Sequence, residues 1–199
     1  KQVLNLGILG IDHSHIFDML DEMLKEGCNC NFFWTEGSPL TLNEFSKKYP
    51  QIKRVDNKSD ILGDDTIDLI LISSIPKNRA KLSIDAMKAG KDVMVDKPGC
   101  TTLEQLNNLK QIVKDTGKIW SINFSERFHV AAVTKAEELV ADGKIGKVKQ
   151  TIGTGPHRQG NYERPDWFYD RDSYGGIITD IGSHQIHQFL VFTNSNEAK

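Results

Sequence analysis

Two short stretches of the chain carry side chains that can bind and move a proton. They are DKP at 96–98 and DIGSH at 180–184. Lys97 stands at the end of a predicted strand and precedes a rigid proline, where a lysine can act as a base. Asp180 and His184 lie four positions apart at the start of a predicted helix, so both can face one cleft. Such a set can take a proton from a hydroxyl group and return it.

Each of these residues also has an ordinary structural interpretation. Lys97 could be a surface lysine before a turn, and His184 a core histidine bonded to backbone. Asp180 could cap the helix, a role that is compatible with catalysis.

The N-terminal loop, GILGIDHSHIF at 7–17, resembles a nucleotide-binding turn only in part. Gly10 fits the first glycine of G-x-G-x-x-G, but Asp12 and His15 stand where the other two belong. We expect Asp12 to turn outward or to cap the helix that starts near Ser14. The helix N-terminus would still attract phosphate, with His13 or His15 as a further donor.

The same loop raises two alternatives. Asp12, His13 and His15 could hold a metal, but three ligands on one tight turn rarely converge and no Cys/His cluster completes the set. We therefore predict no metal site. The turn could also be a structural remnant that binds nothing.

The elements that must position these residues alternate along the chain. Apolar runs predict strands over 3–9, 31–34, 67–72, 93–95 and 119–124, and apolar periodicity predicts helices over 14–26, 39–49, 78–89 and 103–116. This alternation predicts an α/β fold, a doubly wound parallel sheet that ends near residue 123. Beyond it we expect a helix over 130–141, a strand over 148–153 and a helix over 186–192. The polar and aromatic run at 155–176 is a surface loop or the lining of a site.

Polar residues follow two of the predicted strands. Glu36 comes after the second strand, where this fold places an acid that bonds the adenosine ribose. An acid there would repel a 2′-phosphate, which favours NAD over NADP. Ser73 and Ser74 end the strand over 67–72, at the edge where ligands bind in such sheets.

Bulk properties exclude several classes of protein. A net charge of -2 over 199 residues gives no electrostatic argument for nucleic acid or a membrane surface. No apolar run approaches the roughly 20 residues of a membrane span. Three cysteines without a zinc-type C-x-x-C pair suit a reducing compartment, and we expect a cytoplasmic protein. The first residue is Lys1 rather than Met, so an exported form stays open.

In order and spacing, GILGIDHSHIF, AGKDVMVDKPGC at 89–100 and GGIITDIGSHQIH at 175–187 resemble the Gfo/Idh/MocA oxidoreductases. ERF at 126–128 and DGKIGKV at 142–148 support the match. The resemblance implies a Rossmann domain over 1–123, followed by the beginning of a C-terminal α/β open-sheet domain over 124–199. It also implies that the chain is truncated at its C-terminus and that the complete protein is a homo-oligomer, a dimer or tetramer.

The resemblance implies hydride transfer between NAD and a sugar, inositol or related polyol. The catalytic residues would be Lys97, Asp180 and His184. The cofactor would contact Gly10, Ile11, Asp12, His13, His15, Glu36, Ser73, Ser74, Lys97, Pro98 and Asn123. The substrate would contact Lys97, Arg127, His157, Trp167, Asp180 and His184. The alternatives are a glycoside hydrolase or epimerase with an internal NAD redox cycle, and a ligand-binding Rossmann protein without catalysis.

Overall fold

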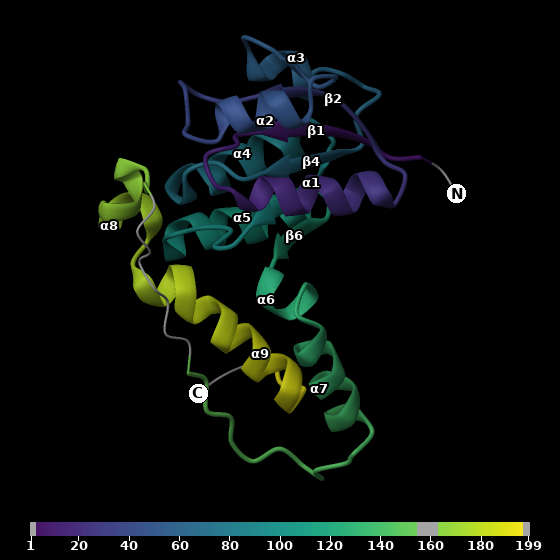
Figure 1. Cartoon of the computed structure of the whole chain (residues 1–199), viewed down its shortest axis with the longest axis vertical. Coiled ribbons are helices and arrows are strands. Elements are labelled where there is room, and N and C mark those ends of the chain that lie inside the picture. Colours follow the sequence, from purple (N-terminus) through teal and green to yellow (C-terminus); the bar gives the residue numbers. More distant parts are fainter. Residues whose placement is uncertain (1–2, 155–162, 197–199) are drawn as a thin grey trace.

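The computed structural model describes residues 3–154 and 163–196. One parallel sheet of six strands, in the order β3-β2-β1-β4-β5-β6, dominates the N-terminal part (Figure 1). The strands are β1 (Asn5–Leu9), β2 (Asn29–Trp34), β3 (Lys53–Arg54), β4 (Leu69–Ile72), β5 (Asp92–Asp96) and β6 (Trp120–Asn123). This is the strand order of the Rossmann fold, which confirms the predicted fold class.

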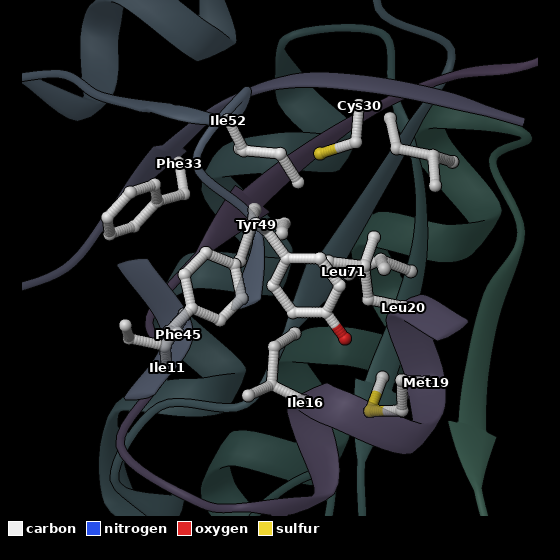
Figure 2. Packing of buried hydrophobic residues seen from close by; sticks show 12 residues of the cluster. Ile11, Ile16, Met19, Leu20, Cys30, Phe33, Phe45, Tyr49, Ile52 and Leu71 are labelled. Atoms are coloured by element: carbon white, nitrogen blue, oxygen red, sulfur yellow. The ribbon is translucent and has the colours of Figure 1, made fainter. Parts of the chain in front are cut away.

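Helices cover both faces of the sheet. They are α1 (His15–Lys25), α2 (Leu42–Lys48), α3 (Lys58–Leu62), α4 (Pro76–Lys88) and α5 (Leu103–Thr116). Because side chains alternate along a strand, β4 sends Leu71 to one core and Ile70 and Ile72 to the other. The first core packs α1 and α2 on the sheet around Phe33, Phe45 and Tyr49, and the ring centroid of Phe45 lies 4.9 Å from those of Phe33 and Tyr49 (Figure 2). The second core lies under α3, α4 and α5.

The C-terminal part leaves the sheet after β6 (Figure 1). It contains α6 (Ser125–Phe128), α7 (Ala131–Ala141), the 3₁₀ turn η1 (Asp166–Tyr169), α8 (Arg171–Tyr174), the π-helical turn η2 (Ile178–Gly182) and α9 (Ser183–Thr193). Helix α9 packs against α6 and α7. The turn η2 directly precedes α9, and its Asp180 contacts Lys97, the residue that follows β5. None of the helices in the described segments is both long and apolar enough to cross a bilayer.

Several expectations about single elements were wrong or incomplete. Residues 148–153 are not a strand, because nothing in the described segments pairs with their backbone. The helix expected over 186–192 begins earlier, at Ser183. The short elements β3, α3, α6, η1 and α8 were not predicted, since runs of two to five residues carry little periodicity.

Gly10 is one of the positions at which the structure leaves no room for a side chain. Its φ is +85°, and a Cβ there would lie 2.4 Å from the Ser74 Cβ and 2.8 Å from the Ser74 Cα. The loop after β1 and the end of β4 can therefore approach closely only with glycine at this position.

We expect Gly10→Ala to lower the free energy of unfolding by roughly 2–5 kcal/mol, the sum of a left-handed backbone and an overpacked contact. Gly27→Ala is the matched control, because Gly27 has φ +88° with nothing within 4 Å of its Cβ position. It should cost only the backbone part, roughly 1–2 kcal/mol. Urea denaturation measures the free energy of unfolding of both variants. Equal losses in Gly10→Ala and Gly27→Ala would contradict the close approach of Gly10 to Ser74.

Candidate active site

Two pockets flank the loop that joins β1 to α1. The Gly10 pocket, about 440 Å³, is lined by Gly10, Asp12, Trp34, Glu36, Gly37, Lys58, Ser74, Ile75, Asn78, Lys81 and Leu82. The Lys97 pocket, about 620 Å³, is lined by His13, Ser14, His15, Lys97, Ser125, Glu126, Arg164, Phe168, Tyr169, Tyr174, Ile177, Asp180, Ile181 and His184. Asp12 borders the first pocket and its neighbour His13 the second. An elongated ligand that occupies both pockets must therefore pass along this loop.

A buried ion pair forms the floor of the Lys97 pocket. The Nζ atom of Lys97 lies 2.6 Å from Oδ1 of Asp180 and donates a second hydrogen bond to the Asp180 carbonyl at 3.1 Å. Both residues are buried. The pair joins the end of β5 to the turn η2, which brings together two of the residues that the sequence selected as catalytic.

His184, the third of these residues, lines the same pocket. It is 3% exposed, and its Nδ1 has no hydrogen-bond partner among the described residues. Its Nε2 lies 3.9 Å from Oε1 of Glu126. Burial and the positive charge of Lys97 lower the pKa of His184 to about 4, so the imidazole is neutral near pH 7 and can bind a hydroxyl group.

Asp96, directly before Lys97, is held from two sides. The guanidinium of Arg79, itself fully buried, donates from Nη2 to Oδ2 of Asp96 at 2.9 Å. Nδ1 of His15 lies 2.7 Å from the other carboxylate oxygen, Oδ1. Burial alone would raise the pKa of Asp96, but Arg79 and His15 hold it well below its usual range. Asp96 is therefore a permanent carboxylate.

Arg79 also fixes the backbone around this point. Its Nε donates to the carbonyl of Ser74 at 2.8 Å, and Nη1 donates to the carbonyls of Asp96, Lys97 and Pro98. The peptide between Lys97 and Pro98 is cis. One side chain of α4 thus ties the end of β4 to the segment that presents Lys97.

The expected cap of α1 was wrong. The helix begins at His15, and the N-cap residue Ser14 has helical backbone angles and makes no side-chain cap bond. Instead, Nδ1 of His13 accepts the hydrogen bond of the His15 amide at 3.1 Å. Burial lowers the pKa of His13 to about 3, which keeps this ring neutral and able to accept.

His13, His15 and Asp96 also form a cluster with metal-ligand chemistry. One ligand atom from each residue lies within 4.8 Å of the others. However, Asp96 Oδ2 is engaged by Arg79, and His13 Nδ1 accepts the His15 amide. These interactions occupy one oxygen of Asp96 and one nitrogen of His13, and the expectation of no metal site stays a prediction.

Asp12 points neither outward nor toward the start of α1. Its side chain lines the Gly10 pocket and also a smaller cavity of about 270 Å³ beside Trp167. Burial raises the pKa of Asp12 to about 6, although the amides of Asp12 itself and of Ile75 donate to the carboxylate and oppose the shift. These amides are the donors that a phosphate would use in a nucleotide-binding turn.

The Gly10 pocket fits the adenosine half of a dinucleotide. Glu36 lines this pocket. Because Gly10 has no Cβ, the loop between β1 and α1 approaches Ser74 closely. Lys58 and Lys81 also line the pocket, but both are paired with Asp85, at 2.6 and 3.2 Å. The preference for NAD over NADP stays a prediction.

Other residues predicted to bind the cofactor lie behind the pockets. Ile11 is fully buried in the first core. Ser73 accepts the His13 amide on its carbonyl at 3.0 Å and donates from Oγ to the His13 carbonyl at 3.2 Å, so it holds the loop. Pro98 offers its carbonyl to Arg79, and the buried Nδ2 of Asn123 has no partner among the described residues.

The secondary substrate candidates are scattered. Arg127 forms a bidentate ion pair with Glu137, with Nη2 at 2.7 Å, and so faces α7. Trp167 lines the small cavity near Asp12, with its ring 6.2 Å from that of His13. His157 lies outside the described residues. Their roles stay predictions.

Several residues of the Lys97 pocket were not selected from the sequence. Glu126, Arg164, Phe168, Tyr169 and Ser125 line it. The polar and aromatic run that contributes three of them was the available signal. No signal in the sequence marked Arg79, because it stands between exposed lysines in a helix whose sequence resembles that of a solvent-exposed helix.

Comparisons with known proteins identify the family and the fold of the chain. Residues 39–124 match the oxidoreductase family GFO_IDH_MocA, NAD-binding Rossmann fold, and residues 133–198 match the GFO/IDH/MocA C-terminal domain. The first match confirms the prediction of an NAD-binding fold. D-xylose dehydrogenase of Paenarthrobacter nicotinovorans is 26% identical over 148 residues, 72% of this chain and 38% of that protein.

Among solved structures, a provisionally assigned oxidoreductase from Erwinia carotovora atroseptica is 39% identical, with a TM-score of 0.92 over 96% of this chain and 57% of that one. Levoglucosan dehydrogenase in complex with NADH is 20% identical, with a TM-score of 0.76 over 96% of this chain and 54% of that one, and shares the fold. The chain thus spans about half the length of these relatives, or less. Two matched domains in the family's order, together with the resemblance of the motifs, establish that the chain belongs to the Gfo/Idh/MocA family of oxidoreductases.

Proposed function

We propose that the protein transfers a hydride between NAD and a sugar, inositol or related polyol. The observation that carries this proposal is the buried Lys97–Asp180 ion pair, 2.6 Å long, beside the neutral His184 in a pocket next to the nucleotide-binding loop. When bound, the nicotinamide supplies the site that accepts or gives the hydride. The chain's own residues bind and polarise the substrate.

Lys97 is the proposed contact to the reacting oxygen. Its ammonium, paired with Asp180, carries no lone pair, so it donates to the oxygen and stabilises negative charge that develops there. Asp180 fixes the direction of the ammonium. The neutral imidazole of His184 holds a second hydroxyl group of the polyol.

The lining of the Lys97 pocket supports a carbohydrate-like substrate. Phe168 and Tyr174 stack with ring centroids 6.0 Å apart, which offers an apolar face for the C–H side of a sugar. Lys97, Asp180 and His184 offer polar groups on the pocket wall. The names of two similar proteins, a D-xylose dehydrogenase and a levoglucosan dehydrogenase, agree with this class.

A second candidate is a ligand-binding Rossmann protein without turnover. Asp12 favours it, because a carboxylate occupies the amides that would otherwise hold pyrophosphate.

We also propose a cytoplasmic homo-oligomer with domains over 1–123 and 124–199. The three free cysteines support a reducing compartment.

For Lys97 we expect Lys97→Ala to lower turnover by about 10²–10⁴-fold in the intact protein, because the reacting oxygen loses its charged donor. NADH formation with a panel of sugars and polyols measures it. Lys110→Ala, an exposed lysine on α5, is the control and should leave turnover unchanged.

Lys97→Ala also leaves the Asp180 carboxylate buried without its partner, which destabilises the fold. Circular dichroism must therefore show a folded variant, and Asp180→Asn provides a second test in which the ammonium remains. Turnover within about threefold of wild type in folded Lys97→Ala would end the assignment.

For the cofactor, we expect Asp12→Asn to tighten NAD binding by about tenfold at pH 7.5, or about 1.4 kcal/mol, since a carboxylate no longer faces the phosphates. In the wild type, affinity should weaken as the pH rises through about 6, where Asp12 loses its proton. The variant should lack this dependence. Titration calorimetry between about pH 5 and pH 8, a range that includes this pKa, measures the NAD affinity and its pH dependence.

Asp12 has a parallel effect on stability. The folded chain holds the Asp12 proton more tightly than the unfolded chain, so the contribution of Asp12 to stability falls as the pH rises from 3.8 toward about 6. Asp12→Asn should therefore unfold at a higher temperature than wild type at pH 7.5. Asp18→Asn, on the exposed face of α1, is the control.

The calorimetric titration can contradict the role of Asp12. An NAD affinity and pH profile that stay unchanged in Asp12→Asn would place the carboxylate away from the cofactor.

A further inference from the structure

Glu36 lies on an exposed loop whose shape is set by contacts outside the Gly10 pocket. The Glu36 side chain is exposed and lines this pocket, where the proposed function puts the adenosine ribose of NAD. A carboxylate binds a ribose more tightly when its backbone is already held in place, because less conformational freedom is lost on binding. The residues that hold this loop therefore contribute to cofactor binding.

Contacts with the loop after β1 hold the chain on one side. The amide of Gly10 donates to the carbonyl of Trp34, the last residue of β2, at 2.7 Å. The amide of Ile11 donates to Oγ1 of Thr35 at 3.4 Å, and Thr35 is buried. These two bonds fix the chain as far as Thr35, the residue before Glu36.

On the other side of β2 the sheet ends early. The strand β3 has only two residues, and the amide of Val55 after it donates to the carbonyl of Phe33 at 2.9 Å. Carbonyls two residues apart point to the same side of an extended chain, so the carbonyl of Thr35 points past the end of β3. The guanidinium of Arg54 fills this place. Its Nη2 donates to the carbonyl of Thr35 at 2.9 Å and to that of Gly37 at 2.7 Å.

Arg54 thus holds the residues directly before and after Glu36 with one nitrogen atom. The chain bends at 36–37, and Gly37 has φ +59°, a turn conformation that glycine adopts without steric cost. Both bonds end on main-chain carbonyls, and none of the ion pairs in the described segments joins Arg54 to Glu36. The guanidinium therefore fixes the backbone of Glu36 without engaging its carboxylate.

We propose that Arg54 is a positioning residue of the cofactor site. It holds the Glu36 carboxylate where this group binds the free ribose hydroxyls of NAD and repels the 2′-phosphate of NADP. The inference rests on the proposed function and deepens it, because it names a residue that fixes the cofactor preference. Within the described part of the chain, Glu36 and Gly37 line the Gly10 pocket and Arg54 does not, so Arg54 acts through the loop.

The charge of Arg54 and its hydrogen bonds predict opposite effects on cofactor preference. A cation near the pocket would attract NADP more than NAD, because the 2′-phosphate adds negative charge. Hydrogen bonds that hold Glu36 in place favour NAD, because the carboxylate binds the free ribose and repels the phosphorylated one. A residue that only stabilises the fold favours neither. The ratio of the two affinities therefore distinguishes the three roles.

Titration calorimetry of the intact protein with NAD and with NADP tests the proposal. We expect Arg54→Ala to raise the Kd of NAD by about threefold to tenfold, since two hydrogen bonds from a charged donor are lost. The Kd of NADP should stay the same or fall, so the ratio of the NADP to the NAD dissociation constant falls. Arg54→Lys keeps a charged donor and should recover part of the NAD affinity. Lys53→Ala removes the same charge from the neighbouring exposed position of β3 and should leave both constants unchanged.

A double-mutant cycle measures whether Arg54 acts through Glu36. Without the carboxylate there is nothing for Arg54 to position, so Arg54→Ala should change the NAD affinity of Glu36→Ala by less than about twofold. Thermal unfolding without cofactor serves as the control for the fold. An equal loss of NAD affinity from Arg54→Ala in the presence and absence of Glu36 would overturn the proposal.

The affinity ratio can overturn it as well. A higher ratio in Arg54→Ala would assign Arg54 to charge attraction, and an unchanged ratio would make it a structural residue only. A wild type that binds NADP more tightly than NAD would contradict the role of Glu36, and this inference fails while hydride transfer stands. A wild type that binds NAD but oxidises no polyol would contradict hydride transfer and leave the role of Arg54 intact. If the wild type binds neither cofactor, both proposals fail.

Discussion

The buried contact between Arg79 and Asp96 is the interaction on which the rest of the site depends. Two opposite charges without exposed surface are tolerated only when each is paired and its other hydrogen bonds are made. Arg79 satisfies this condition by bonding four backbone carbonyls as well as the carboxylate. The same bonds fix the backbone that presents Lys97. Removing the guanidinium would therefore disturb the candidate active site and the fold together.

The loop after β1 illustrates how a nucleotide-binding turn can change its chemistry while keeping its shape. Gly10 remains because no side chain fits against Ser74. At the positions of the later glycines, Asp12 contributes a carboxylate and His15 an imidazole. His13 caps the helix with its ring, and this leaves the His15 side chain free to reach Asp96. Asp12 itself lines the Gly10 pocket, where burial raises its pKa to about 6.

The sequence predicted most helices and strands, but it did not predict the contacts between them. Apolar runs such as LILI in β4 mark buried strands, and their alternation with helices fixes a parallel sheet. Lys97, Asp180 and His184 could be found because their motifs are local. The burial of Arg79 could not, since it depends on where α4 lies against β5. The prediction of a strand over 148–153 was wrong for a related reason. A strand needs a neighbouring strand to pair with, and an apolar run in the sequence does not reveal whether one is present.

The pairing of Lys97 with Asp180 links the two parts of the chain chemically. Asp180 lies in a π-helical turn, a wider coil that is frequent at functional sites, and this turn directs its carboxylate to the end of β5. Because Asp96 precedes Lys97, the strand end carries two ion pairs side by side, one to α4 and one to η2. The first pair is closed to the pocket, while the second borders it and can respond to a ligand. Under the proposed function, a substrate oxygen that replaced part of the Lys97–Asp180 contact would meet a charge already desolvated and oriented. This is the form of preorganisation that favours a developing alkoxide over the neutral alcohol.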